Sequence, residues 1–385
     1  MKKITYSTLI LLLLTFVVRA QDEVVNSPNG GSEKMMVPGY AVTMYQYSNT
    51  PGTTPTHNFS PVGIAAFPIV KYNDRLFLDC ALTLGANSDG SATAGIGELV
   101  GFYKINDYMT AFLGNFSPHY GIYLGILDDF TDRFGTGVGP VGMGHGLANQ
   151  NGVGIQGGFQ AGYSKFTYQV YAANGPQLIA DTSAADIGST GMLKYDPYTD
   201  NNRNKSVGWH VGFLPFSNSC LELTFSGEYV PKTGASGDPN FENINATSMA
   251  FGLNYYHVFN PIMVRVLGEY NSVRVTNYHY SWQVTDSTSI VLPDFNNKQN
   301  GWFAGMTLRA TGSQSHFLSN LEFAGRLGAY NPPKDALWGG AQTTQTTFTI
   351  TYYLTWAIPL SFEYDALTQN GVTQKIFSTV LFFRF

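Results

Sequence analysis

The sequence contains few charged residues for its length. Asp, Glu, Lys and Arg make up 12% of its 385 residues, about half of the fraction in an average soluble domain. It has only two cysteines, Cys80 and Cys220. In the alternating strand pattern described below, the side chain of Cys80 points outward and that of Cys220 points inward, so no disulfide is expected between them. After residue 20, no apolar run is long enough for a transmembrane helix. These shortages argue against an ordinary soluble domain, a disulfide-stabilised fold and a helical membrane protein.

Aromatic residues and glycine are abundant instead. Phe, Trp and Tyr reach 15% of the sequence, and Gly occurs 42 times. The strands of a transmembrane β-barrel alternate between a lipid face and a lumen face, so they need no continuous apolar run. This composition therefore favours a β-barrel.

The first twenty residues have the pattern of a secretory signal peptide. Lys2 and Lys3 form a positive start, residues 8–18 are apolar, and Val18-Arg19-Ala20 fits a cleavage site. Removing this segment removes three basic residues and takes the formal net charge from −5 to −8. A chain this acidic is not expected to bind nucleic acid or anionic lipid.

The predicted domain organisation is simple. Residues 1–20 are the signal peptide, 21–37 a short polar periplasmic segment, and 38–385 a single outer-membrane β-barrel. The periplasmic segment is too short to form a folded plug, so no energy-coupled transport is expected.

The C-terminal segment, TQKIFSTVLFFRF, alternates strictly between two faces. Phe377, Leu381, Phe383 and Phe385 share one face, with Thr379 as its only polar member, and the even-numbered residues from Ile376 to Arg384 share the other. A period of two indicates a strand. A final strand that ends on Phe is typical of bacterial outer-membrane barrels, in which the assembly machinery reads the terminal aromatic. Phe385 and Phe383 are the predicted assembly signal; an edge strand of a soluble sheet is the alternative.

Counting back from this strand predicts an all-β fold, a transmembrane antiparallel β-barrel of about 16 strands, with 14 or 18 as alternatives. The alternation is best in the C-terminal half of the chain, and the inward face there is rich in Thr, Ser, Asn and Gln, as a wet lumen requires. The expected strands span residues 39–48, 60–71, 75–86, 92–105, 107–116, 151–163, 166–174, 206–216, 219–230, 245–258, 261–272, 298–310, 318–330, 343–356, 358–367 and 373–385.

The connections alternate between short and long. If Phe385 is periplasmic, the tight turns fall on the periplasmic side, and the long loops, among them 117–150, 175–205 and 368–372, fall outside. The least certain connection is 311–317, where a strand is easily merged or missed. This arrangement predicts a location in the outer membrane of a Gram-negative bacterium.

The longest connection, residues 117–150, is the predicted constriction. It follows the fifth expected strand and is therefore the third external loop, which in trimeric porins folds into the barrel. Residues 122–134 have helical spacing, which would turn Asp128, Asp129 and Asp132 towards water. His119 and Arg133 belong to the same loop.

Several segments around this loop resemble porin-type outer-membrane proteins of Bacteroidetes, which are related to the phosphate-selective O/P porins. The resemblance covers about residues 60–180 and rests on ELV at 98–100, YKINDY at 103–108, GNFSP at 114–118, YGIY at 120–123, GIQGGF at 154–159 and YAANGP at 171–176. It implies a channel, with a homotrimer as the expected assembly.

One position departs from that family. Members usually carry a basic residue where this chain has Asn115, so anion or phosphate selectivity is not expected here. By strand parity the lumen residues include more acids than bases, which predicts a weak cation preference; pairing across the lumen would cancel it. The predicted constriction and lumen residues outside the loop are Asn115, Arg265, Glu269, Arg309, Glu322 and Arg326.

The leading functional prediction is passive diffusion of small hydrophilic solutes through a loop-constricted barrel. A closed barrel that binds an adhesin target or another envelope protein, and a transporter of hydrophobic substrates, are the alternatives. No Ser/His pair on the outer wall, metal-ligand spacing or phosphate-binding glycine loop was found, so neither an enzyme nor a cofactor is predicted. The expected partners are outer-membrane lipids, the β-barrel assembly machinery and small solutes.

Overall fold

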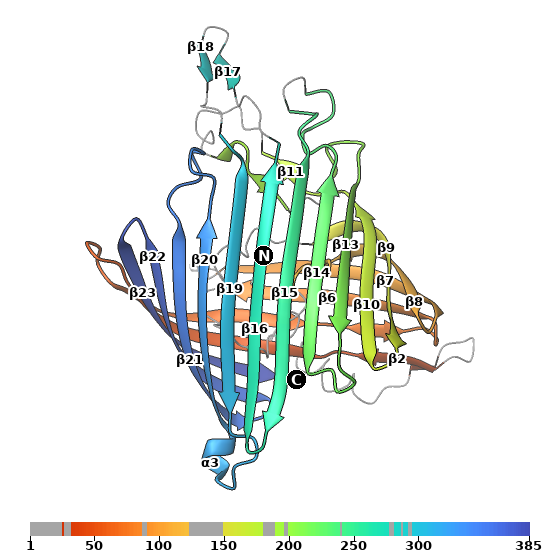
Figure 1. The fold of residues 1–385 in the computed structure, drawn as a ribbon, viewed down its shortest axis with the longest axis vertical. Coiled ribbons are helices and arrows are strands. Elements are labelled where there is room, and N and C mark those ends of the chain that lie inside the picture. The colour runs from red at the N-terminus through yellow and green to blue at the C-terminus, as the bar shows by residue number, and fades with distance from the viewer. Residues whose placement is uncertain are drawn as a thin grey trace, which may run out of the picture.

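The computed structural model describes residues 25–26, 32–86, 91–122, 149–179, 189–195, 199–238, 241–276, 281–285, 288–291 and 295–385. These residues form a closed barrel of 16 antiparallel strands. The strands on the near side of the barrel cross those on the far side, as tilted barrel strands do (Figure 1). The predicted fold class is therefore confirmed.

The barrel strands follow each other in chain order around the wall. Of the 16 positions in the barrel wall, fourteen are occupied by one strand each, and each of the first two is occupied by two consecutive strands. Their bounds are β2 (Ser32–Met36) and β3 (Gly39–Asn49), β4 (Thr56–Ala66) and β5 (Ile69–Lys71), β6 (Leu76–Ala86), β7 (Ala92–Asn106), β8 (Met109–Phe116), β9 (Gln150–Ala161), β10 (Ser164–Ala173), β13 (Ser206–Leu214), β14 (Leu221–Val230), β15 (Ala246–Phe259), β16 (Ile262–Val275), β19 (Lys298–Arg309), β20 (Leu321–Asn331), β21 (Thr343–Thr355), β22 (Ile358–Gln369) and β23 (Val372–Arg384).

The C-terminal strand closes the barrel. β23 pairs with β3 from Lys375↔Asn49 to Arg384↔Tyr40, and the backbones of Phe385 and Gly39 exchange two further hydrogen bonds. Phe383 and Phe385 are 42% and 38% exposed, whereas Phe382 is 2% exposed. The alternation in the sequence thus becomes an outer face and an inner face, since successive side chains of a strand point to opposite sides.

The first two wall positions are each interrupted at a proline. β2 pairs with β5 and β3 pairs with β4, with Pro38 and Pro68 at the breaks. Proline cannot donate a ladder hydrogen bond, and the ladder continues on either side of the two breaks. A further short strand, β1 (Val25–Asn26), pairs with β2, so strand pairing is present at residues 25–26 and from Ser32 onward, ahead of the barrel boundary expected at residue 38.

Two connections differ from their predicted form. The expected external loop 368–372 is a tight turn at Asn370 and Gly371, because β22 and β23 each continue to its edge. Residues 310–320, on the side of the C-terminus, contain the short helix α3 (His316–Ser319), with Ser315 as its N-cap, and no additional strand. The connection that was least certain in the sequence thus leaves the strand number at 16.

The long loops gather at one end of the barrel. They carry the two-stranded sheets β11 (Gln177–Leu178) with β12 (Leu193–Lys194) and β17 (Ser281–Thr285) with β18 (Thr288–Val291), and α3 lies at the opposite end (Figure 1). Buried apolar side chains from these loops and the adjoining strand ends form one cluster, the outer cluster, which includes Leu178, Tyr195, Phe241, Ile244 and Phe295. Within the described residues, no helix is long and apolar enough to cross a membrane.

Candidate functional site: the barrel lumen and the inward loop

Both ends of loop 117–150 are attached to β7. The Ser117 amide donates to Glu98 Oε1 (3.0 Å), and the Ser117 hydroxyl donates to Asn149 Oδ1 (2.8 Å). The Asn149 side-chain amide donates in turn to the carbonyl of Gly97. These hydrogen bonds hold the start and the end of the loop together at one place on the wall, the loop anchor.

From this anchor the described start of the loop turns into the lumen. The His119 amide donates to Gln169 on β10 (2.8 Å), and the Gly121 amide donates to Ser226 on β14 (3.0 Å). The Ile122 amide donates to Glu269 Oε2 on β16 (2.6 Å). All three acceptors lie on the inner face of the wall and are less than 5% exposed. Inward side chains of successive strands thus hold the loop through its backbone.

Gly121 makes the last of these contacts possible. Its φ of +64° lies in the left-handed region, and a Cβ at this position would collide with the Glu269 carboxylate. Glycine is the residue that accepts both conditions without steric cost. Tyr120 and Ile122 on either side of it are each 3% exposed, so the loop start is packed against the wall.

Two histidines meet where the loop contacts β13 (Ser206–Leu214). The rings of His119 and His210 lie edge to face with centroids 5.9 Å apart. Nδ1 of His210 lies 2.8 Å from the Ser226 hydroxyl, which also receives the Gly121 amide. Burial lowers the pKa of His119 below its ordinary value. Burial therefore favours the neutral form of the His119 imidazole at this contact.

A polar wall covers the inner face of β20, β21 and β22. Arg326, 2% exposed, donates to the Thr347 hydroxyl (3.2 Å), and that hydroxyl donates to Asp365. Gln345 also donates to Asp365 (3.2 Å), and the Thr351 and Ser361 hydroxyls lie 2.9 Å apart. Threonines at every second position of β21 thus link the charges of β20 and β22.

The other predicted charges of this region form a second group nearer the turn end. Arg309 and Glu322 are register partners on β19 and β20. The guanidinium of Arg309 lies 4.0 Å from the ring centroid of Tyr353, whose hydroxyl donates to Glu322 (3.1 Å). Arg265, on β16, donates to Asn254 (3.1 Å). These charges are held by neighbouring side chains of the wall.

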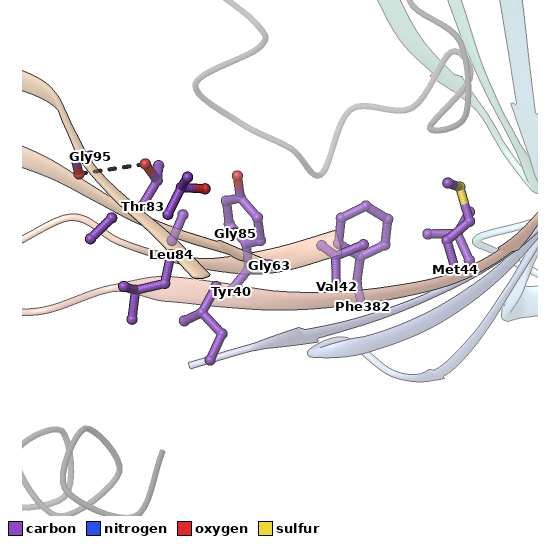
Figure 2. A pocket seen from close by; sticks show the side chains of 14 residues that line it. Tyr40, Val42, Met44, Gly63, Thr83, Leu84, Gly85, Gly95 and Phe382 are labelled. Atoms are coloured by element: carbon purple, nitrogen blue, oxygen red, sulfur yellow. Dashed lines mark hydrogen bonds between the residues drawn. The ribbon is translucent and has the colours of Figure 1, made fainter. Parts of the chain in front are cut away.

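An apolar wall lies on β23, β3, β4 and β6. Val380 and Phe382 are 1% and 2% exposed, and they pair with Met44 and Val42. Figure 2 shows the side chains of Tyr40, Val42 and Phe382 along these strands, with the small residues Gly63, Gly85 and Gly95 beside them. Together they border a cavity of about 460 Å³. The lumen thus has two chemically different surfaces.

The predicted site residues are only partly brought together. His119 and Glu269 meet at the inward loop, and Arg309 and Glu322 meet on the polar wall. Asn115 pairs with Leu99, which is 45% exposed, and donates to Asn151, so the register places it on the outer face. The remaining predicted constriction residues, Asp128, Asp129, Asp132 and Arg133, lie outside the described residues.

Sequence reasoning missed the residues that hold the loop. Gln169, His210 and Ser226 are neutral, and each is an ordinary inward residue of its strand. Gln169 and Ser226 accept hydrogen bonds from the backbone of residues 119 and 121, and His210 contacts the His119 ring and Ser226, which no side-chain pattern can indicate. The one available signal was the Tyr120-Gly121 pair, where a glycine follows an aromatic residue shortly after the strand end at Phe116.

No metal centre is evident in the described part of the chain: no three His, Cys, Asp or Glu side chains there are grouped to hold an ion. Cys80 and Cys220 are both free thiols.

Comparison with models of known protein families gave no match, and no curated protein is similar in sequence. Solved structures are similar in fold. The outer-membrane channel DcaP of Acinetobacter baumannii has a TM-score of 0.60 at 12% identity, covering 94% of this chain and 99% of that chain. The anion-selective porin from Comamonas acidovorans has a TM-score of 0.57 at 13% identity, covering 92% and 100%.

Salmonella typhi OmpF, solved in complex with daunomycin, has a TM-score of 0.55 at 14% identity over 92% of this chain and 98% of that chain. At such identities the likeness concerns the fold, which agrees with the closed antiparallel barrel described above. The chain therefore has the closed antiparallel barrel fold of outer-membrane porins and channels of Gram-negative bacteria.

Proposed function

We propose that this protein is a passive outer-membrane channel for small hydrophilic solutes. The observation that carries the proposal is the inward turn of loop 117–150 inside a closed barrel with a polar inner wall. A barrel of 16 strands is wide enough to leave an aqueous channel. Its selectivity is then set by what narrows the lumen.

The inward loop start is the proposed constriction. It lies against the wall formed by β10 to β16, and three backbone hydrogen bonds hold it there. Solutes would pass between this loop and the facing parts of the wall. The charges predicted for the rest of the loop, Asp128, Asp129, Asp132 and Arg133, would line the same passage.

A glycine substitution tests the constriction. Gly121→Ala places a Cβ against Glu269 at a backbone conformation that disfavours side chains by roughly 1–2 kcal/mol. We expect the loop to detach and the single-channel conductance in a planar bilayer to rise. Gly162→Ala is the matched control, because its φ is +62° and its Cβ would meet nothing within 4 Å. Equal conductance for the wild type and both variants would contradict a constriction at this point.

A weak preference for cations is the finer proposal. Two bases of the barrel strands, Lys71 and Lys104, pair with the exposed turn residues Asp74 and Asp107. The acids of the inner wall, such as Glu228, Glu269 and Glu363, are buried on that face. Fixed negative charge in a narrow pore enriches cations. The reversal potential in a salt gradient measures this preference, and an anion-selective value would contradict it.

A closed barrel that binds another molecule is the second candidate. The outer cluster favours it, because buried apolar side chains from several loops meet at one end of the barrel. Asn297 and Trp338 donate to the carbonyls of Gly191 and Thr190 and tie these loops together (2.7 and 3.0 Å). Swelling of protein-containing liposomes in sugars of graded size separates the candidates, because a closed barrel gives no swelling with any sugar.

The remaining expectations are proposals of the same kind. The segments quoted above support a relationship to Bacteroidetes porins and a homotrimer, which cross-linking in the native membrane would detect. Phe385 and Phe383 support recognition by the assembly machinery. We infer no catalytic role, and an esterase assay in detergent tests that inference.

A further inference from the structure

A buried carboxylate and three tyrosines converge beneath the outer cluster. Glu228 on β14 is 2% exposed, and Tyr120, Tyr171 and Tyr195 are 3%, 3% and 7% exposed. Each of the three tyrosines interacts electrostatically with Glu228. Tyr120 comes from the inward loop, Tyr171 from β10 and Tyr195 from the loop that follows β12, so three separate segments supply the hydroxyls.

The strand register explains how these groups meet. Tyr171, Gly208 and Glu228 are register partners on β10, β13 and β14, and Ser248 on β15 is the next partner of Glu228. A Cβ at Gly208 would overlap the ring of Tyr171. The ring therefore lies across β13 at the position where Gly208 has no side chain, and this directs it towards Glu228. Ser248 lies within hydrogen-bonding reach of Tyr120 above it.

The described part of the chain does not satisfy the polar atoms of this chamber. The hydroxyls of Tyr120, Tyr171 and Tyr195 and both carboxylate oxygens of Glu228 are buried and lack a well-formed hydrogen bond within the described residues. The Ser206 hydroxyl lies within reach of the carboxylate, and it also lies 3.4 Å from the carbonyl of Ala173. Buried polar groups are normally hydrogen-bonded, so a group of such atoms indicates a missing partner.

The missing partner also bears on the charge of Glu228. None of the ion pairs formed by the described residues includes Glu228, and no basic side chain among them exerts a resolved effect on it. An unpaired carboxylate is costly to bury, so the carboxyl group must either hold a cation or bind a proton. Water would satisfy the hydroxyls, but the carboxyl group would then have to bind a proton. A cation satisfies both demands, since carboxylate and hydroxyl oxygens are its ligands and tyrosine rings attract it through their faces.

We propose that the chamber formed by Glu228, Tyr120, Tyr171, Tyr195, Ser206 and Ser248 binds a small monovalent cation, either an inorganic ion or the protonated amine of a solute. The bound cation would fasten the inward loop, through Tyr120, and the outer loop, through Tyr195, to the same two strands. The outer cluster, which includes Tyr195 and Val230, keeps water away from it. The site does not depend on the channel function, because a closed barrel would bind the same ion.

Thermal unfolding of the purified full chain in detergent tests the proposal. The protein is first dialysed into N-methylglucamine chloride, whose cation is much larger than potassium or methylammonium. Potassium chloride or methylammonium chloride then replaces it at constant ionic strength. We expect the unfolding midpoint to rise with the logarithm of the potassium or methylammonium concentration, as it does for a ligand that binds the folded state. The cation that raises the midpoint at the lower concentration shows whether the chamber prefers an inorganic ion or a protonated amine.

Two isosteric substitutions on one strand provide the comparison. Glu228→Gln should weaken the response to either cation at least tenfold, whereas Glu222→Gln, on the same inner face of β14, should leave it unchanged. Tyr171→Phe should weaken the response to the cation by a smaller factor. This variant replaces Glu228→Gln in the test if Glu228→Gln does not fold. The proposal is overturned if the wild-type midpoint is the same in all three salts, or if Glu222→Gln loses the response as fully as Glu228→Gln.

Discussion

The inner face of β20, β21 and β22 carries Thr, Gln, Glu, Asp and Arg, whereas the inner face of β23, β3, β4 and β6 carries aromatic, aliphatic and glycine residues. Both walls have the same alternation and the same backbone ladder. They differ in what occupies the inward positions. On the polar wall each charge is fixed by a hydrogen bond to a neighbour, and on the apolar wall small residues leave a cavity of about 460 Å³.

This difference shows that the strand geometry sets which positions face the lumen but not what the lumen offers a solute. A polar wall keeps water and ions close to fixed charges, and an apolar wall gives the less polar side of a solute a surface to contact. The predictions below test each wall in turn, and then the loop and the rim.

Removal of the arginine of the polar wall should have the largest effect. Arg326→Leu leaves Thr347 and Asp365 without their cationic partner in a buried network. Loss of one partner of a buried charge pair costs about 3–5 kcal/mol. We expect this decrease in the free energy of unfolding, measured by urea titration in lipid vesicles. The double variant with Asp365→Leu should recover much of it; a decrease below about 1 kcal/mol for Arg326→Leu would show that the network is not coupled.

Truncation on the apolar wall should cost somewhat less. Phe382→Ala removes a ring that packs near Tyr40, with centroids 6.3 Å apart. We expect a loss of about 3 kcal/mol in the same titration, at the lower end for this substitution because the ring borders an existing cavity. Phe377→Ala is the control on the outer face of the same strand, where the side chain is 47% exposed. A smaller loss for Phe382→Ala than for Phe377→Ala would contradict packing on the apolar wall.

Acidification should loosen the inward loop without disturbing either wall. Burial lowers the pKa of His119, so the docked loop binds this proton more weakly than the released loop does. The docked form is therefore stable above about pH 6.5 and loses stability as the pH falls below that value. The neighbouring His210 ring adds repulsion once both imidazoles are charged, whereas Gln169 and Ser226 do not titrate. The remaining contact, the Glu269 carboxylate that receives the Ile122 amide, accepts that hydrogen bond less strongly once it is protonated, so its titration acts in the same direction.

We expect the single-channel conductance to rise between pH 7.5 and pH 5. His119→Gln should reduce this rise, and His257→Gln, on the outer face of β15, should leave it intact. A pH response that is identical in the wild type and His119→Gln would place the titrating group elsewhere.

The smallest effect is expected at the rim of the apolar wall. Asp74 pairs with Lys71 at 2.7 Å, but its side chain is 96% exposed. Exposed pairs of this kind contribute little because water and salt screen them. Asp74→Asn should therefore leave the midpoint of urea unfolding unchanged at physiological salt. A clear shift would show that the rim is less hydrated than its exposure indicates.

Much of the fold could be predicted from the sequence. The alternation counted back from Phe385 gives the inward and outward faces of β23, and the same pattern gives the polar face of β21. The ends of strands were harder to predict. Residues 368–372 were expected to form a five-residue loop, but the turn at Asn370-Gly371 needs only two residues. Asn115 was misplaced for a related reason: its face depends on a register at the strand end, next to Gly114 with its φ of +140°.

The site was less predictable than the fold. Acidic residues such as Glu228 and Glu269 could be assigned to the lumen by parity, but parity does not say which of them hold the loop or remain without a basic partner. Those properties depend on residues far apart in sequence, such as Ile122 and Glu269, which are 147 positions apart. Backbone donors take part in these contacts, and every residue except proline has one.

The sequence by itself determined that the chain forms an antiparallel barrel with defined inner and outer faces, because a period of two in hydrophobicity is a local property of each strand. The tertiary structure decided which inner residues meet. Closure brings β3 beside β23 and bends the wall so that β10, β13, β14 and β16 face the same stretch of loop. The chamber around Glu228 exists because Gly208 lets the Tyr171 ring cross a strand, a packing relation that no single strand carries.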